Sequence, residues 1–423
     1  MLPTLLPLGL VLLSLQPAPA QAGVLHNVHS FAKRHTKQFA RDLRVAFGGM
    51  VLPRDSSEAQ HVLYCKVSSG SSLTSDGDDS DSGTSPSSSG HHSGSTTKTG
   101  TASSASATAT SSYNSPWKLK TEKSGDSFFD GWDFWSTTDP TNGTVTYVDE
   151  DTARKNNLIS VNDDGNVIMR VDTTEQVSDG RMSVRIHSQD VFTGGLLILD
   201  AVHLPTGCGS WPAFWTNGPN WPTGGEIDIV EYVHDYTNDQ ATVHTAPGCS
   251  LPTDSAKELN ITGSIVGGTN CAAAETGNQG CGVRSPDKHS AGAAFNSIGG
   301  GVYTMVWDDD GIAIYFFRRD SIPDDITAGE PRPDLWGTAA ARWPASSCDP
   351  YKYFYDNIAI FDTTFCGDWA GSAWTTSGIL GQDTSCADRT GVSTCEEYVL
   401  NHGSSFKETY WEIKSYKLYQ QSK

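Results

Sequence analysis

The segment Gly224-Gly-Glu-Ile-Asp-Ile-Val-Glu231 sets three carboxylic acids among apolar residues. On a β-strand, residues two apart share a face, so Glu226 and Asp228 point one way and the isoleucines that alternate with them point to the core. Glu231 follows Glu226 by five positions, and an unbroken strand would send it to the opposite face. A β-bulge at residues 229–230 would return Glu231 to the side of the other two acids, and we predict one there.

Three carboxyl groups on one face of a sheet are suited to glycoside hydrolysis. A retaining glycosidase needs two of them ~5 Å apart, one ionised to attack the anomeric carbon and one protonated to donate to the leaving oxygen. Crowding of like charges pushes their pKa values apart, so one carboxyl can keep its proton near neutral pH. Asp228 would orient the attacking carboxylate by a hydrogen bond. A solvated strand face or a calcium-binding acid pair would show a similar alternation, so the spacing alone leaves these alternatives open.

Tryptophans precede the acids and are suited to stacking on sugar rings. Trp211, Trp215 and Trp221 lie within twenty residues of the acidic segment, and each indole offers apolar area together with an N–H donor. Packing in the core is the alternative for these side chains. Trp221 has Pro, Asn and Gly around it, which indicates an exposed loop and makes it the first candidate for a sugar platform.

The pattern from Trp117 onward is typical of an all-β domain, because short alternating runs are broken by Gly, Asp, Asn and Pro and no long stretch has a helical period. Residues 303–307 and 312–317 flank Asp308-Asp309-Asp310-Gly311 and predict a hairpin. So many short strands in one domain favour a two-sheet sandwich or jelly roll. Further strands are expected at 166–171, 183–186, 195–203, 226–233, 241–245 and 411–414.

The 423 residues divide by composition into four parts. Residues 1–22 contain an apolar run followed by small residues, which is typical of a secretory signal peptide. The run is shorter than the ~20 residues that span a bilayer, which disfavours an uncleaved anchor. Residues 67–115 are rich in Ser, Thr and Gly and predict a disordered linker. All twelve Trp lie at or after Trp117, so we expect the catalytic domain to cover 116–423.

Residues 23–66 form a basic N-terminal segment with seven Lys or Arg and three acids. Phe31, His35, Phe39 and Leu43 recur every four residues, which predicts an amphipathic helix. Two functions stay open for it. The helix could bind a membrane surface or a cell wall, or the segment could be a pro-region cut near Lys33-Arg34.

Cysteine usage agrees with export. Eight of the nine Cys lie in the expected domain, an even number that predicts disulfides in an oxidising compartment. Their pairing is left open, and Cys65 remains over in the N-terminal part. Sequons at Asn142-Gly-Thr and Asn260-Ile-Thr would be glycosylated in a eukaryotic secretory pathway. The net charge of −20 repels nucleic acid and anionic lipid, so we expect neutral partners.

Several motifs together carry a resemblance to a known family. They are the acidic segment, Gly207-Cys-Gly-Ser-Trp-Pro-Ala-Phe-Trp215, Thr242-Val-His-Thr245 and Trp307-Asp-Asp-Asp-Gly-Ile-Ala-Ile-Tyr-Phe316. On these motifs the chain resembles glycoside hydrolase family 16, and within it the fungal laminarinase-like endo-β-1,3(4)-glucanases, from about Ser124 to the C-terminus. The resemblance implies a β-jelly-roll sandwich of two antiparallel sheets, an open substrate cleft on the concave face, and retention of anomeric configuration.

Roles for individual residues follow from the match of motifs. Glu226 corresponds to the nucleophile, Asp228 to the assisting acid and Glu231 to the general acid/base. His244 resembles the family histidine near the reaction centre, although a histidine on a strand can also be purely structural. Arg185 is a candidate donor to a distal glucose unit, and the three tryptophans are candidate sugar platforms.

We therefore expect a secreted, monomeric endo-β-glucanase that acts on β-1,3 or mixed β-1,3/1,4 glucans without an organic cofactor or catalytic metal. A structural calcium ion stays open, although the sequence has no recognisable loop for it. A cell-wall transglycosylase and a glucan-binding protein without activity are the alternatives. The intact trio of acids disfavours the second alternative. No partner other than the glucan is expected, and neither nucleic acid nor a membrane span after signal removal.

Overall fold

The computed structural model describes residues 113–422. The predicted signal peptide, the basic N-terminal segment with Cys65, and most of the predicted linker lie outside the described residues. Ser115 is buried, and its Oγ donates to the carbonyl oxygen of Pro331 at 2.6 Å. The last residues assigned to the linker therefore pack on the domain.

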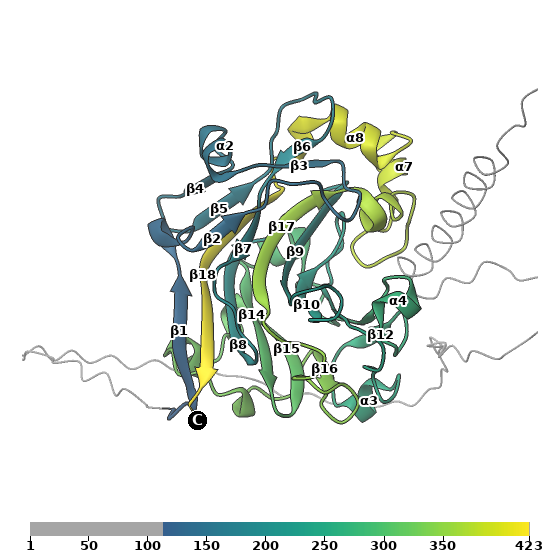
Figure 1. Ribbon diagram of the computed structural model, residues 1–423. Helices are drawn as coiled ribbons and strands as arrows, with labels where there is room; N and C mark the ends of the chain where they lie inside the picture. Colours follow the sequence, from purple (N-terminus) through teal and green to yellow (C-terminus); the bar gives the residue numbers. More distant parts are fainter. Residues whose placement is uncertain (1–112, 423) are drawn as a thin grey trace, which may run out of the picture. The chain divides into compact units, whose positions relative to one another are not determined.

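Two antiparallel sheets of eight strands each build the described part of the chain (Figure 1). We call them the back sheet and the acid sheet. In spatial order, the back sheet contains β16 (Ala341–Pro344), β15 (Gly311–Arg318), β14 (Gly301–Asp308), β8 (Gly195–His203), β18 (Tyr410–Gln421), β5 (Val167–Arg170) and β4 (Ile159–Val161), with β1 (Trp117–Lys123) also paired to β18. The acid sheet contains β12 (Ser264–Val266), β13 (Cys281–Arg284), β11 (Gln240–His244), β10 (Glu226–Glu231), β9 (Ser210–Asn217), β17 (Ile358–Phe365), β7 (Arg185–Ser188) and β2 (Trp132–Phe134).

The other elements are short and lie in the connections. A parallel pair of strands, β3 (Val145–Tyr147) and β6 (Arg181–Ser183), stands apart from both large sheets. The α-helices are α2 (Glu150–Lys155), α3 (Ala256–Leu259), α4 (Ala273–Thr276), α5 (Gly292–Ser297), α6 (Asp324–Thr327), α7 (Cys386–Thr390) and α8 (Cys395–Asn401). The remaining helical turns are η1 (Gly125–Ser127), η2 (Arg319–Ser321), η3 (Pro333–Leu335), the π-helix η4 (Gly367–Gly371) and η5 (Gly403–Phe406).

The core lies between the two sheets. Phe214 and Phe361 point inward from neighbouring strands of the acid sheet with ring centroids 4.4 Å apart, and Trp411 of the back sheet packs edge-on against Phe361 at 5.5 Å. Full burial of a side chain of this size contributes roughly 1.5–3 kcal/mol. This packing confirms the predicted all-β jelly-roll sandwich, and it leaves the outer face of the acid sheet, which we call the acid face, for polar side chains.

Most predicted strands are confirmed. The predicted hairpin is β14 and β15, which pair from Gly301↔Arg318 to Asp308↔Gly311. The segments at 166–171, 195–203, 226–233, 241–245 and 411–414 correspond to β5, β8, β10, β11 and β18.

The single strand predicted at 183–186 is wrong. The chain changes sheets at Val184, so Ser183 ends β6 and Arg185 begins β7. Ser183 donates its hydroxyl to the carbonyl oxygen of Thr363 at 2.6 Å, whereas Arg185 pairs with Asp362 across the acid sheet. A short alternating run cannot reveal such a change of partners, because both halves alternate in the same way.

Four disulfides account for the eight cysteines of the domain, as the even count predicted. They are Cys208–Cys386, Cys249–Cys348, Cys271–Cys281 and Cys366–Cys395. Two of them, Cys208–Cys386 and Cys366–Cys395, hold the segment that carries η4, α7 and α8.

Removing the Cys208–Cys386 bridge with paired Ser substitutions should lower the free energy of unfolding by about 2–4 kcal/mol, because the bridge spans 178 residues and restricts the unfolded chain. The matched control is the pair Cys271→Ser and Cys281→Ser, whose bridge spans only 10 residues. The loss there should be about 2 kcal/mol smaller. Denaturant unfolding measures both variants, and equal losses would contradict the loop-length argument.

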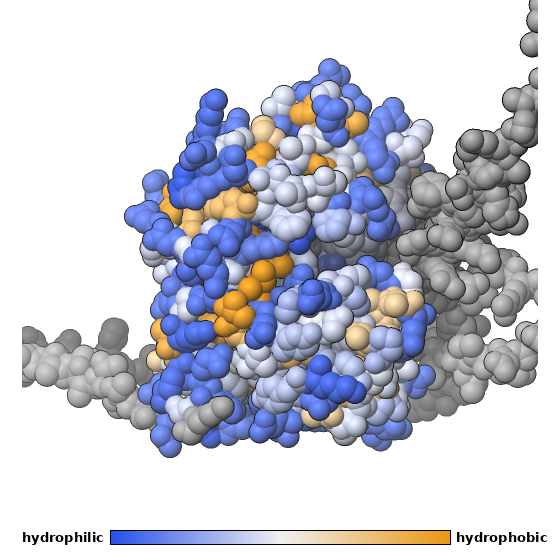
Figure 2. Space-filling view, in the orientation of Figure 1, coloured by the Kyte–Doolittle hydropathy of each residue, from blue (hydrophilic) through white to orange (hydrophobic). Residues whose placement is uncertain are grey.

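The visible surface of the domain is mostly polar. Figure 2 shows predominantly hydrophilic residues on the face in view, with apolar residues in a few groups. Asn142 and Asn260, the two sequon asparagines, are both exposed. Among residues 113–422, none of the helices has the length and apolarity that a membrane crossing requires.

Candidate active site

The predicted bulge lies at Ile229. β10 pairs with β9 in one register up to Asp228 and in a shifted register from Val230, which leaves Ile229 without an opposite residue. The partners of the three acids on β9 are spaced two apart and so share a face. These pairs are Glu226↔Asn217, Asp228↔Trp215 and Glu231↔Ala213. The bulge therefore brings Glu231 to the acid face with the other two carboxyls, as the spacing predicted.

Asp228 lies close to both Glu226 and His244. It is 2% exposed, and its Oδ2 lies 3.4 Å from Nε2 of His244. Burial and then the charge of Glu226 raise the pKa of Asp228 well above its usual range. A hydrogen bond between two carboxyls needs one proton, so the protonated Asp228 can donate to Glu226. This bond can fix the orientation of the Glu226 carboxylate.

Glu231 is held at both ends. Its Oε1 accepts a hydrogen bond from Nε1 of Trp211 at 2.8 Å, and its backbone N–H donates to Oδ1 of Asp239 at 2.8 Å. Burial raises the pKa of Glu231 well above its usual range, while the Trp211 N–H acts in the opposite direction. A carboxyl that keeps its proton to higher pH is suited to be a general acid.

The three candidate tryptophans all reach the acid face. Trp221 is 44% exposed, and its Nε1 donates to the Glu226 carboxylate. Trp215 lies opposite Asp228, and Trp211 holds Glu231. All three keep part of their surface accessible, and Trp211 also packs against the hydrophobic core. Other tryptophans do cover the core, namely Trp336, Trp343 and Trp374.

Arg185 lies on the same face of the acid sheet, on β7, which β17 separates from β9. Its guanidinium carbon is 5.0 Å from the ring centroid of Trp135 and 5.0 Å from that of Trp215, and its Nη1 is 3.6 Å from Oδ2 of Asp362. Only 5% of the residue is exposed. Arg185 is thus stacked between two indoles, where it supports the tryptophan surface.

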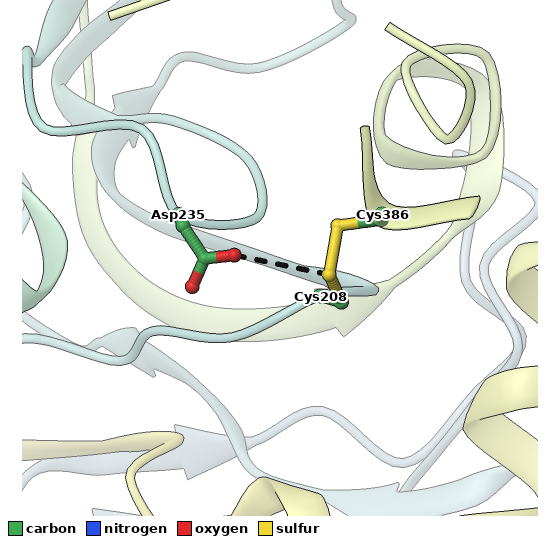
Figure 3. Close-up of side chains that lie close together, drawn as sticks. All are labelled: Cys208, Asp235 and Cys386. Atoms are coloured by element: carbon green, nitrogen blue, oxygen red, sulfur yellow. Dashed lines mark hydrogen bonds between the residues drawn. A yellow bond between two sulfur atoms is a disulfide. The ribbon is translucent and has the colours of Figure 1, made fainter. Parts of the chain in front are cut away.

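Two groups on the described residues bring three possible metal-ligand atoms within 4.8 Å of one another. In the group of Cys208, Asp235 and Cys386, shown in Figure 3, the two sulfurs form a disulfide and cannot act as thiolate ligands. The other group is Glu226, Asp228 and His244. Calcium takes six to eight oxygen ligands, and two carboxylates with an imidazole nitrogen do not fit that preference.

Several residues of the site were not predicted from the sequence. Asp239 contacts the amide of Glu231 from the residue before β11, and nothing in the local pattern indicates which amide a buried carboxyl will reach. Trp369 packs edge-on against Trp211 with centroids 5.8 Å apart, from the distant η4. Asp362 did have a signal, since it is a single acid within the apolar run of β17.

The buried carboxyls should make the protein less stable at alkaline pH. Burial raises the pKa of Asp362 from its ordinary 3.8 to about 7 in the folded state, despite the lowering effect of Arg185. A raised folded-state pKa contributes stability that is fully present below the ordinary pKa and is lost as pH rises through about 7. We expect the Tm to fall between about pH 4 and about pH 7, the interval between these two pKa values.

The measurement is a Tm series across this range. The control is Asp362→Asn, which mimics the protonated carboxyl and should flatten part of the decline. A Tm that stays level or rises toward pH 7, or a variant with the slope of the wild type, would contradict the prediction.

Known proteins that are similar to this chain include glycosidases, in agreement with the geometry of the site. The family model described as an XgeA-like, catalytic GH16 domain matches residues 132–419. A probable glycosidase of Schizosaccharomyces pombe is 45% identical over 307 residues, which are 72% of this chain and 69% of that protein. A probable endo-1,3(4)-β-glucanase of Aspergillus clavatus is 42% identical over 308 residues, 72% of this chain and 46% of that protein. The chain thus spans less than half the length of that glucanase.

Two solved structures are similar over nearly their whole length. Laminarinase 16A of Phanerochaete chrysosporium, solved with β-glucans in its donor and acceptor sites, is 36% identical with a TM-score of 0.65, and the match covers 72% of this chain and 99% of that one. An elongating family 16 β-1,3-glucosyltransferase is 38% identical with a TM-score of 0.65, covering 72% of this chain and 100% of that one.

Proposed function

Because this chain belongs to glycoside hydrolase family 16, we propose that it is an endo-acting, retaining β-glucanase that hydrolyses β-1,3 or mixed β-1,3/1,4 glucans. The observation that carries the proposal is the convergence of Glu226, Asp228 and Glu231 on one face across the bulge. The relative from Aspergillus clavatus and the laminarinase bear names that specify these substrates, and their similarity supports the choice of glucan.

The proposed reaction has two steps. In the first, a carboxylate oxygen of Glu226 bonds to the anomeric carbon, the glycosidic C–O bond breaks, and the leaving oxygen takes the proton of Glu231. In the second, Glu231 accepts a proton from water as the water oxygen bonds to the anomeric carbon, and the bond to Glu226 breaks. Two inversions at the same carbon give net retention. The raised pKa of Glu231 supports its role as the acid of the first step.

The substrate is proposed to lie along the acid face. The exposed ring of Trp221 beside Glu226 offers a platform for a sugar next to the reacting bond. Trp211 and Trp215 bound the same region, and His244 contacts the carboxyl of Asp228. Arg185 is proposed to serve a more distant glucose unit, mainly through the indoles that it supports.

Product analysis tests the proposal. Purified protein should release reducing ends from laminarin, lichenan or barley glucan, with a mixture of oligosaccharides early in the reaction, as an endo-acting enzyme gives. NMR of the first products should show the β-anomer. Absence of release from all three glucans, or first products of the α-anomer, would refute the proposal.

Transglycosylation is the second candidate, because a structure of 38% identity is an elongating β-1,3-glucosyltransferase. The glycosyl group would then pass from Glu226 to a sugar hydroxyl instead of water. Incubation with a defined laminari-oligosaccharide separates the two functions. Products longer than the starting sugar at low substrate concentration would favour transfer, and only shorter products favour hydrolysis.

Secretion and a monomeric state belong to the proposal as well. Four disulfides within residues 113–422 are consistent with an oxidising compartment. Intact mass of the protein from culture medium would show whether residues 1–22, or also 23–66, have been removed. Light scattering would give the oligomeric state.

A further inference from the structure

Beyond the bulge, Glu231 has a strand partner on β9 but none on β11. The ladder between β10 and β11 ends at Asp228↔Thr242, so the strand end that carries Glu231 pairs only with β9. Its backbone N–H is bonded to a side chain in place of a β11 carbonyl, namely Oδ1 of Asp239 at 2.8 Å. The carboxyl of Asp239 thus replaces the β11 carbonyl that would otherwise accept a hydrogen bond from the Glu231 N–H.

Asp239 is itself rigidly placed. It is 3% exposed, its own N–H donates to Oγ of Ser290 at 2.9 Å, and its carbonyl oxygen accepts from the N–H of Ser285 at 2.8 Å. The Ser290 hydroxyl in turn donates to the carbonyl oxygen of Asp287 at 2.7 Å. The carboxyl accepts from the backbone amide of Glu231. This buried carboxyl is hydrogen-bonded to a backbone amide rather than paired with a cation, and it serves as a fixed hydrogen-bond acceptor.

We propose that Asp239 is a positioning residue for the general acid/base of this enzyme, acting through the backbone amide of Glu231. This inference rests on the proposed function of Glu231. Asp239 fixes the peptide at one end of the residue, and the Trp211 N–H holds the carboxyl at the other end. Proton transfer depends on heavy atoms within hydrogen-bond reach, and small displacements of a catalytic group lower the rate strongly. Loss of the hydrogen bond between the Glu231 N–H and Asp239 therefore affects the proton transfer by Glu231 more than the attack of Glu226.

Two substrates distinguish this role from a purely structural one. A laminari-oligosaccharide has a sugar leaving group that needs the proton of Glu231, whereas 2,4-dinitrophenyl β-laminaribioside releases a phenolate that needs none. For Asp239→Ala we expect kcat/KM to fall about 30-fold or more on the oligosaccharide and less than about 3-fold on the aryl glycoside. Azide, which needs no general base, should accelerate turnover of the aryl glycoside and yield the β-glycosyl azide.

Three further variants make the result decisive. Asp239→Asn keeps an oxygen that can accept from the Glu231 N–H. It should lower the ratio of kcat/KM on the oligosaccharide to kcat/KM on the aryl glycoside by about 5-fold. This variant tests the proposal if Asp239→Ala does not fold. Asp139→Ala is the matched control, because Asp139 is also buried and accepts from a backbone amide, that of Gly143, at 2.8 Å. It should leave the ratio unchanged. Glu231→Ala sets the largest change in the ratio.

Equal losses on both substrates and no response to azide in a folded Asp239 variant would overturn the inference. If Glu231→Ala itself gave equal losses and no glycosyl azide, the proposed role of Glu231 would fail first. A clear response of Glu231→Ala without any response of Asp239 variants would refute only the positioning role.

Discussion

The Glu226→Ala variant is expected to bind laminari-oligosaccharides with nearly the affinity of the wild type and to turn them over at least about 10⁴-fold more slowly. The carboxylate forms its bond to the anomeric carbon only as the reaction proceeds, so its loss removes stabilisation of the transition state and little of ground-state binding. Calorimetric titration with an oligosaccharide gives the affinity, and reducing-end release gives kcat.

Chemical rescue makes this prediction specific to the nucleophile. The truncated side chain leaves room for azide on the face that Glu226 occupies, and attack from there in a single displacement gives the α-glycosyl azide from an activated β-glycoside. Glu150→Ala is a suitable control, since Glu150 lies at the surface on α2 in an ion pair with Arg154, and it should retain full activity. Unchanged turnover in Glu226→Ala, or rescue with the β-anomer, would show that another group attacks.

The Glu231→Ala variant should lose about 10³-fold in kcat/KM on glucans and much less on aryl glycosides with good leaving groups. The reason is that a sugar oxygen leaves only with a proton, whereas a dinitrophenolate leaves without one. Rates on both substrate classes, measured side by side, give the ratio. A similar loss on both would exclude Glu231 as the general acid.

The pH dependence provides an independent measurement of the same role. Activity requires the protonated form of Glu231, so it should decline as pH rises through the raised pKa of this carboxyl. The Trp211 N–H lowers that pKa by its hydrogen bond. Trp211→Phe should therefore move the alkaline limb of the kcat/KM profile to higher pH, and a shift to lower pH would contradict the assignment.

The motif around the acids allowed an unusually detailed prediction because two simple periodicities conflict in it. Glu226 and Asp228 follow the strand period of two, and Glu231 does not. A single bulge is enough to bring Glu231 to the same face, and the register of β10 against β9 confirms this prediction. Residues 183–186 offered no such conflict. Their alternation continues through the point where the chain leaves β6 for β7, and the error followed from that.

The order of residues alone determines an all-β domain, a bulge at residues 229–230 and the acids that the bulge aligns, since alternation and spacing are local properties of a strand. Only the tertiary structure decided what surrounds those acids. The disulfide pairs, the stacking of Arg185 between two indoles and the bond from the Glu231 amide to Asp239 join residues from different strands and loops. Such contacts depend on how two curved sheets pack, and burial in that packing, rather than sequence spacing, raises the pKa values of Asp228 and Glu231.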